Sequence, residues 1–260
     1  MVAVLVRTRT HAMMRRCASS MARIPPSAVY IAATRVGDES TMGTPEFLSP
    51  AQRETLASAI RVDQAGEVAA NWIYRGQMAI LGKDMVAAPV IQASTLLLSA
   101  HTRLDKSVQE MWDQEKKHLE VMNRLQVQHR VRPTLLTPVA QIAGFGLGVV
   151  TALMGKEAAM ACTEAVETTI GEHYDESVLF DSSWVDVDGL SSQLKALEPM
   201  EKVHPSIELL RKVIVELRDD ELEHLDTAVV HHSQRAPQHA LLTTIVEGGC
   251  KLAIELCKRI

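Results

Sequence analysis

Apolar residues recur every three to four positions along most of this chain, which predicts helices that each bury one face. In the second predicted helix, for example, the stripe runs through Trp112, Met122 and Leu125. No segment outside residues 38–50 favours strands, so the predicted class is all-α. The predicted helices are 51–81, a helix ending near 130, one through 174 to about 179, one from about 205, and a last apolar segment 240–260.

The stretch 133–155 contains no charged residue over 23 positions, which is long enough to cross a bilayer. Pro138, Gln141 and several glycines interrupt it, and its C-terminal part is expected to lead straight into the third helix. We favour an apolar helical segment that faces the core on one side and a membrane surface on the other. A purely internal helix and a transmembrane helix are the alternatives.

The N-terminus has a different composition from the rest. Residues 1–37 contain six arginines and no Asp or Glu, which is typical of a mitochondrial transit peptide. A basic tail that stays attached is the alternative. Loss of these six charges would take the formal net charge from −5 to −11, and such an acidic protein is not expected to bind nucleic acid. Residues 38–50, rich in Gly and Pro, are predicted to be a linker before one domain, 51–260.

A repeated motif carries the chemistry. Glu115 precedes His118 by three positions, and Glu221 precedes His224 in the same way, so each pair shares one helix face. Each predicted helix upstream carries one Glu, followed seven positions later by a Tyr. These upstream pairs are Glu67 with Tyr74 and Glu167 with Tyr174. A third Glu-x-x-His, at 201–204, lies between two prolines, where a helix turn is not expected.

Four Glu and two His in this order form the ligand set of ferritin-like di-iron or di-manganese helical bundles. Each single Glu-x-x-His could be an ordinary solvated helix face, but the doubled set is hard to explain in that way. Four carboxylates buried together also need a cation, since burial of an unpaired charge costs several kcal/mol. We predict that each metal takes one His, that Glu67 and Glu167 face one another, and that Glu115 and Glu221 bridge.

Residues near these ligands are further candidates. His173 and Tyr174 follow Glu167 closely and are predicted to line a proton or substrate path beside the metals, although His173 could equally be structural. Asp113 and Asp219 occupy the same place in both copies of the repeat. They are candidates to orient an imidazole from outside the metal sphere, and either could equally be a surface charge.

Six stretches resemble the 5-demethoxyubiquinone hydroxylase family of ubiquinone biosynthesis, and the likeness covers most of residues 58–260. The stretches are Arg61–Glu67, Ile73–Met78, Met111–His118, Arg132–Thr134, Gly155–Thr163 and Glu221–His224. The resemblance implies a peripheral monooxygenase on the matrix side of the mitochondrial inner membrane, with two non-heme iron ions and dioxygen as co-substrate. It also implies a polyprenyl benzoquinone substrate and a lipid-binding accessory protein as partners.

The family's iron ligands fall on Glu67, Glu115, His118, Glu167, Glu221 and His224, the same set as the repeat. The chain departs from the family by apparent inserts near 92–109 and 176–204, and by Lys251 where an arginine is usual. No flavin or nicotinamide motif is visible, so the electron donor is left open, with NADH as one candidate. The rival function is a ferritin that stores or detoxifies iron. Such a protein would need neither the uncharged stretch nor an organellar address.

Overall fold

The computed structural model describes residues 25–31, 37–82, 95–183 and 204–260, and side chains within them except at 95–105 and 176–183. All regular structure in these ranges is helical, as predicted. The long helices are α2 (Pro50–Leu81), α3 (Thr95–His129), α4 (Thr137–Leu153), α5 (Lys156–Ser183), α7 (Pro205–Val230) and α8 (His239–Cys257). The short ones are α1 (Ala28–Ile31), η1 (Glu39–Thr41) and η2 (Ser233–Arg235).

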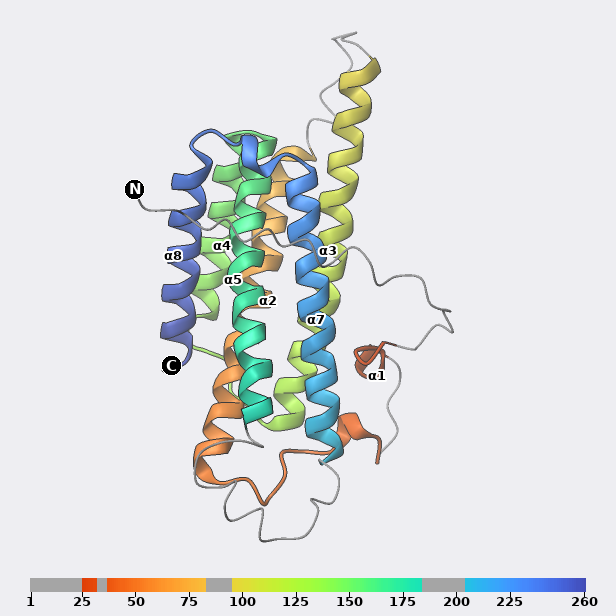
Figure 1. Ribbon diagram of the computed structural model, residues 1–260, viewed down its shortest axis with the longest axis vertical. Coiled ribbons are helices and arrows are strands. Elements are labelled where there is room, and N and C mark those ends of the chain that lie inside the picture. The colour runs from red at the N-terminus through yellow and green to blue at the C-terminus, as the bar shows by residue number, and fades with distance from the viewer. Residues whose placement is uncertain (1–24, 32–36, 83–94, 184–203) are drawn as a thin grey trace, which may run out of the picture.

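The six long helices run side by side as a bundle (Figure 1). Helices α2, α3, α5 and α7 enclose the core, and α2 packs on α3 as α5 packs on α7. The two remaining long helices lie outside this set of four: α4 packs along α2, and α8 packs along α5. Both lie on the side of the bundle away from α3 and α7, while the N-terminal part of α3 projects beyond the other helices (Figure 1).

Helix α2 begins and ends where local chemistry dictates. The Ser49 hydroxyl accepts a hydrogen bond from the Gln52 amide, and the Gln52 side chain accepts one from the Ser49 amide, so a capping box closes the N-terminus. Pro50 occupies the first turn, where its missing N–H costs nothing. The helix ends at Leu81, the predicted end, and Gly82 follows as its C-cap.

The apolar stripe expected on α3 does face the core. Met122 and Leu125 are fully buried and pack with Ile60 of α2 and Leu217 of α7. Full burial of such side chains contributes roughly 1.5–3 kcal/mol each. The same cluster includes Tyr174 of α5, so it holds all four core helices together.

The expectation that the uncharged stretch continues directly into the third helix is wrong. Helix α4 ends at Leu153, and α5 begins at Lys156 as a separate element. Between them Gly155 has a φ of 120°, a left-handed conformation that L side chains rarely adopt. The break lets α4 turn back and pack along α2 instead of extending α5.

Helix α4 approaches α2 so closely that only glycine fits at the contact. A Cβ added to Gly148 would lie 2.1 Å from the Ile73 carbonyl oxygen, and one added to Gly76 would lie 2.3 Å from that of Phe145. The interface therefore brings backbone against backbone. It presents one face of α4 to the bundle, and among the described residues Val139, Ile142 and Leu153 on this helix stay exposed.

The segment before α2 also packs on the bundle. Tyr30 is 2% exposed and donates a 2.6 Å hydrogen bond to the side-chain oxygen of Gln128. The Ser27 hydroxyl and amide donate to the Glu216 carboxylate at 2.6 and 2.8 Å. Residues on both sides of position 37, the predicted end of the transit peptide, thus contact the core helices, whereas residues 1–24 lie outside the described part.

Among the helices that the structure describes, none combines the length and apolarity needed to cross a bilayer.

Candidate metal centre

The six predicted ligands converge at the middle of the bundle from four helices. Glu67 comes from α2, Glu115 and His118 from α3, Glu167 from α5, and Glu221 and His224 from α7. All six are at most 4% exposed. Their ligand atoms form two sets, each within 4.8 Å: Glu67, Glu115, His118 and Glu221, and then Glu115, Glu167, Glu221 and His224.

The two sets share Glu115 and Glu221, the carboxylates predicted to bridge. Each imidazole turns its Nδ1 toward them. His118 Nδ1 lies 3.2 Å from Glu221 Oε1, and His224 Nδ1 lies 3.2 Å from Glu221 Oε2 and 3.1 Å from Glu115 Oε1. The arrangement provides one imidazole and one unshared carboxylate at each of two neighbouring positions.

A tyrosine from the opposite half of the repeat contacts each unshared carboxylate. Tyr174 donates a 2.6 Å hydrogen bond to Glu67 Oε1, and Tyr74 donates one of 2.9 Å to Glu167 Oε1. Tyr174 therefore lies beside a ligand candidate, and its predicted part in a proton or substrate path stays a prediction. Tyr74 was not among the predicted site residues, although its matching offset from Glu67 was the available signal.

Without a cation the cluster is electrostatically unbalanced. Burial and repulsion between carboxylates raise the pKa of Glu115 and Glu167 well above their ordinary values, and burial raises that of Glu67 to about 7. Burial would raise the pKa of Glu221 as well, but hydrogen bonds from both imidazoles outweigh it and lower that pKa. Burial of these carboxylates side by side therefore disfavours their charged forms unless a cation balances them.

These residues fit bound metal. Among the described side chains, Glu115 Oε2 and Glu167 Oε2 are buried with no hydrogen-bond partner. Such oxygens normally find a donor or an ion, because leaving them unsatisfied costs about 1–3 kcal/mol or more. Carboxylate oxygens with neutral imidazoles are donors that suit iron and manganese. Two divalent cations would neutralise the four carboxylates.

His173 contacts an acidic residue that is not one of the six ligands. Its Nε2 forms an ion pair with Asp63 Oδ1 at 3.2 Å, and Asp63 is itself buried on α2. Burial raises the pKa of Asp63, while the contact with His173 opposes that rise. The predicted part of His173 in a proton or substrate path stays a prediction. Lys251 lies at the surface of α8, 3.3 Å from Glu172.

Of the two roles left open for Asp113 and Asp219, the structure favours that of surface charges. Asp113 pairs with Lys116 and Asp219 with Arg218, both at the surface. The next residues along the chain make the contacts instead, as His118 Nε2 lies 3.1 Å from Asp220 Oδ2 and His224 Nε2 lies 2.8 Å from Gln114 Oε1. A shift of one residue along a helix rotates the direction of the side chain by about 100°. That rotation decides whether the side chain faces solvent or the metal site.

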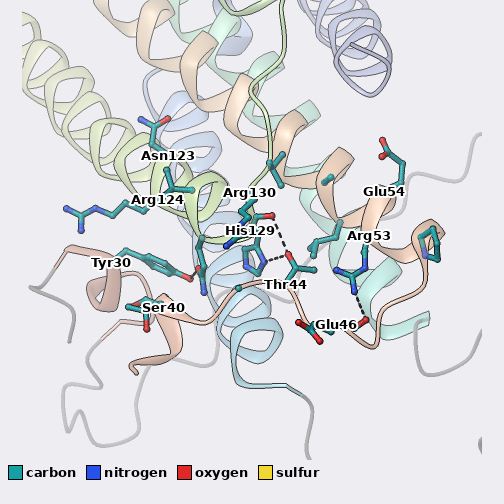
Figure 2. Close-up of a pocket in the computed structure, with 18 residues that line it drawn as sticks. Tyr30, Ser40, Thr44, Glu46, Arg53, Glu54, Asn123, Arg124, His129 and Arg130 are labelled. Atoms are coloured by element: carbon teal, nitrogen blue, oxygen red, sulfur yellow. Dashed lines mark hydrogen bonds between the residues drawn. The ribbon is translucent and has the colours of Figure 1, made fainter. Parts of the chain in front are cut away.

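A surface pocket of about 1270 Å³ lies elsewhere, between the segment before α2, the start of α2 and the end of α3. Figure 2 shows His129 in this pocket beside Thr44, with Nδ1 3.1 Å from the Thr44 hydroxyl. Burial lowers the pKa of His129 to about 4, so its imidazole is neutral. None of the six ligand candidates lines the pocket.

A helical bundle that buries two overlapping sets of carboxylate and imidazole groups defines the class, a candidate two-metal carboxylate protein. Residues 54–257 match the family model described as "Ubiquinone biosynthesis protein COQ7", and this chain belongs to that family. The resemblance expected from the sequence is thereby confirmed.

Curated relatives cover most of the chain. The Mus musculus protein named "NADPH-dependent 3-demethoxyubiquinone 3-hydroxylase, mitochondrial" is 44% identical over 80% of this chain and 79% of its own. The Homo sapiens protein of the same name is 42% identical over the same shares. The "5-demethoxyubiquinone hydroxylase, mitochondrial" of Saccharomyces cerevisiae is 39% identical over 82% of both chains.

Proposed function

We propose that this protein is a non-heme di-iron monooxygenase that hydroxylates the ring of a polyprenylated demethoxyubiquinone in ubiquinone biosynthesis. The observation that carries the proposal is the pair of buried ligand sets sharing Glu115 and Glu221, in a chain of this family. The names of its relatives specify the same reaction. Two iron ions bound there would supply the reductive activation of dioxygen.

The protein's own residues hold and shield the reacting centre. Glu67 with His118, and Glu167 with His224, each complete one metal position around the shared carboxylates. The hydroxyls of Tyr74 and Tyr174 donate hydrogen bonds to the unshared carboxylates, which limits how these carboxylates can rotate. Because all six ligands are buried within a packed bundle, water has little access to the reacting atoms.

NADPH is the proposed source of electrons, because the names of the mammalian relatives specify it. No nicotinamide or flavin motif is visible in the sequence, so the sequence does not indicate where NADPH or a separate reductase would bind. A lipid-binding accessory protein remains a proposed partner, resting on the family resemblance alone.

The proposed location is the matrix surface of the mitochondrial inner membrane. Helices α4 and α8 lie on one side of the bundle (Figure 1) and carry exposed apolar side chains there. These side chains include Val139, Ile142, Leu153, Leu241, Ile245 and Leu252, each at least 55% exposed. An apolar surface of this kind suits a substrate whose tail stays in a bilayer. The contacts of Ser27 and Tyr30 favour transit-peptide cleavage before Ser27 rather than near 37.

The first prediction concerns the reaction. When iron-loaded protein is reduced without air and then given labelled dioxygen and a demethoxyquinone analogue, we expect one labelled oxygen atom in the ring by mass spectrometry. Each reduced centre should react at most once, and Glu167→Ala should give no product. If iron is oxidised to a mineral while the ring stays untouched, the ferritin-like alternative holds and the hydroxylase proposal fails.

The second prediction concerns the membrane. Ile142→Asp combined with Ile245→Asp should release the protein from liposomes of inner-membrane lipid composition in a flotation assay. Both side chains are more than 60% exposed, so the folded bundle should tolerate the change. Leu147 is a poorer choice, because it packs against the cluster around Ile73 and Val246.

The matched control for this experiment is Val127→Asp, an equally exposed apolar side chain on α3, away from α4 and α8. This variant should still float with the liposomes. Unchanged flotation of the double variant would rule out the α4 and α8 surface as the membrane contact.

A further inference from the structure

The two proposed metal positions match in almost every respect. Each has one imidazole, one unshared glutamate and the same two shared carboxylates, and each unshared glutamate accepts a hydrogen bond from one tyrosine. The repeat explains this match, since each half of the chain supplies the same kinds of residue. Any difference between the positions must therefore come from outside this set.

A difference in charge lies behind the imidazoles. Gln114 and Asp220 occupy equivalent places in the repeat, each directly before a bridging glutamate, and each reaches across to the histidine of the other copy. His224 Nε2 lies 2.8 Å from the amide oxygen of Gln114, whereas His118 Nε2 lies 3.1 Å from a carboxylate oxygen of Asp220. Both partners are acceptors and both are half-buried. They differ in charge.

Both acceptors favour the same tautomer, with the proton on Nε2 and the Nδ1 lone pair turned toward the shared carboxylates. The carboxylate should raise metal affinity more than the amide does. Its negative charge makes the imidazole a stronger donor to the cation, and it also attracts the cation directly. Removal of such outer partners typically costs about 10–100-fold in metal affinity.

We infer that the two metal positions are inequivalent, and that the position at His118, backed by Asp220, binds its divalent cation more tightly and fills before the position at His224, backed by Gln114. Asp220 and Gln114 act as positioning residues that set this order. The inference rests on the metal centre proposed above and adds to it a difference that the repeat alone would not produce.

The test is a titration of the metal-free full-length protein with Co(II) in the absence of air, followed by calorimetry and visible absorption. Two equivalents should bind in two resolved steps. Asp220→Asn should weaken the first step about 10-fold or more and leave the second unchanged. Gln114→Glu should strengthen binding in the second step alone, which reduces the difference in affinity between the two steps. This variant also tests the inference if Asp220→Asn fails to fold.

Asp219→Asn is the matched control, because Asp219 is the exposed neighbour that pairs with Arg218. It should leave both steps unchanged. Equal affinities in the unaltered protein, or a loss shared by both steps in Asp220→Asn, would overturn the inference while leaving the metal centre in place. Failure of the unaltered protein to bind any Co(II) would instead overturn the metal centre itself.

Discussion

Glu221→Gln is expected to remove both metal ions and to abolish turnover while the protein stays helical. Glu221 belongs to both ligand sets, and its two oxygens each lie 3.2 Å from a different imidazole. Glutamine keeps the size of the side chain but removes the negative charge that both cations would share. No other single change disturbs both positions so directly, apart from one at Glu115. Iron content by elemental analysis, turnover and circular dichroism are the measurements.

Glu223→Gln is the control for this variant, because Glu223 is two residues away on α7 and exposed to solvent. It removes the same charge from the same helix and should retain normal iron and activity. If Glu221→Gln also retained two iron ions per chain, the ligand assignment would be wrong.

Gly148→Ala is expected to destabilise the protein by about 3 kcal/mol or more, at or above the usual cost of overpacking. The new Cβ would lie 2.1 Å from the Ile73 carbonyl oxygen and 3.0 Å from the Gln77 amide nitrogen. Both neighbours are main-chain atoms of α2, so no side chain can move aside and α4 itself must shift. Urea unfolding followed by circular dichroism measures the loss.

Gly146→Ala is the control on the same helix, and it is not expected to destabilise the protein. A Cβ at Gly146 meets nothing within 4 Å, so the change should leave packing intact. Alanine favours a helix over glycine by about 1 kcal/mol, and the variant should be as stable as the parent or slightly more stable. Equal stability of the two variants would show that α4 does not pack tightly on α2.

Much of the fold follows from local pattern. The α3 stripe through Met122 and Leu125 faces the core as predicted, and α2 spans nearly the predicted range because its cap and its final glycine act locally. The break at Gly155 was missed. A glycine is compatible with both a continuous and a broken helix, and the choice depends on how closely α4 can pack against Gly76 of α2.

In the metal centre, too, some features follow from local sequence spacing and others from the packing of the helices. Spacing along one helix placed Glu115 beside His118 and Glu221 beside His224, because residues three apart share a face in any helix. The crossing of Tyr74 and Tyr174 to opposite glutamates, and the choice of Asp220 over Asp219, depend on how each helix is rotated about its axis. That rotation is decided by packing between helices distant in sequence. The sequence alone therefore determined the kinds of ligand and their helices, and only the tertiary structure decided the partners of each ligand.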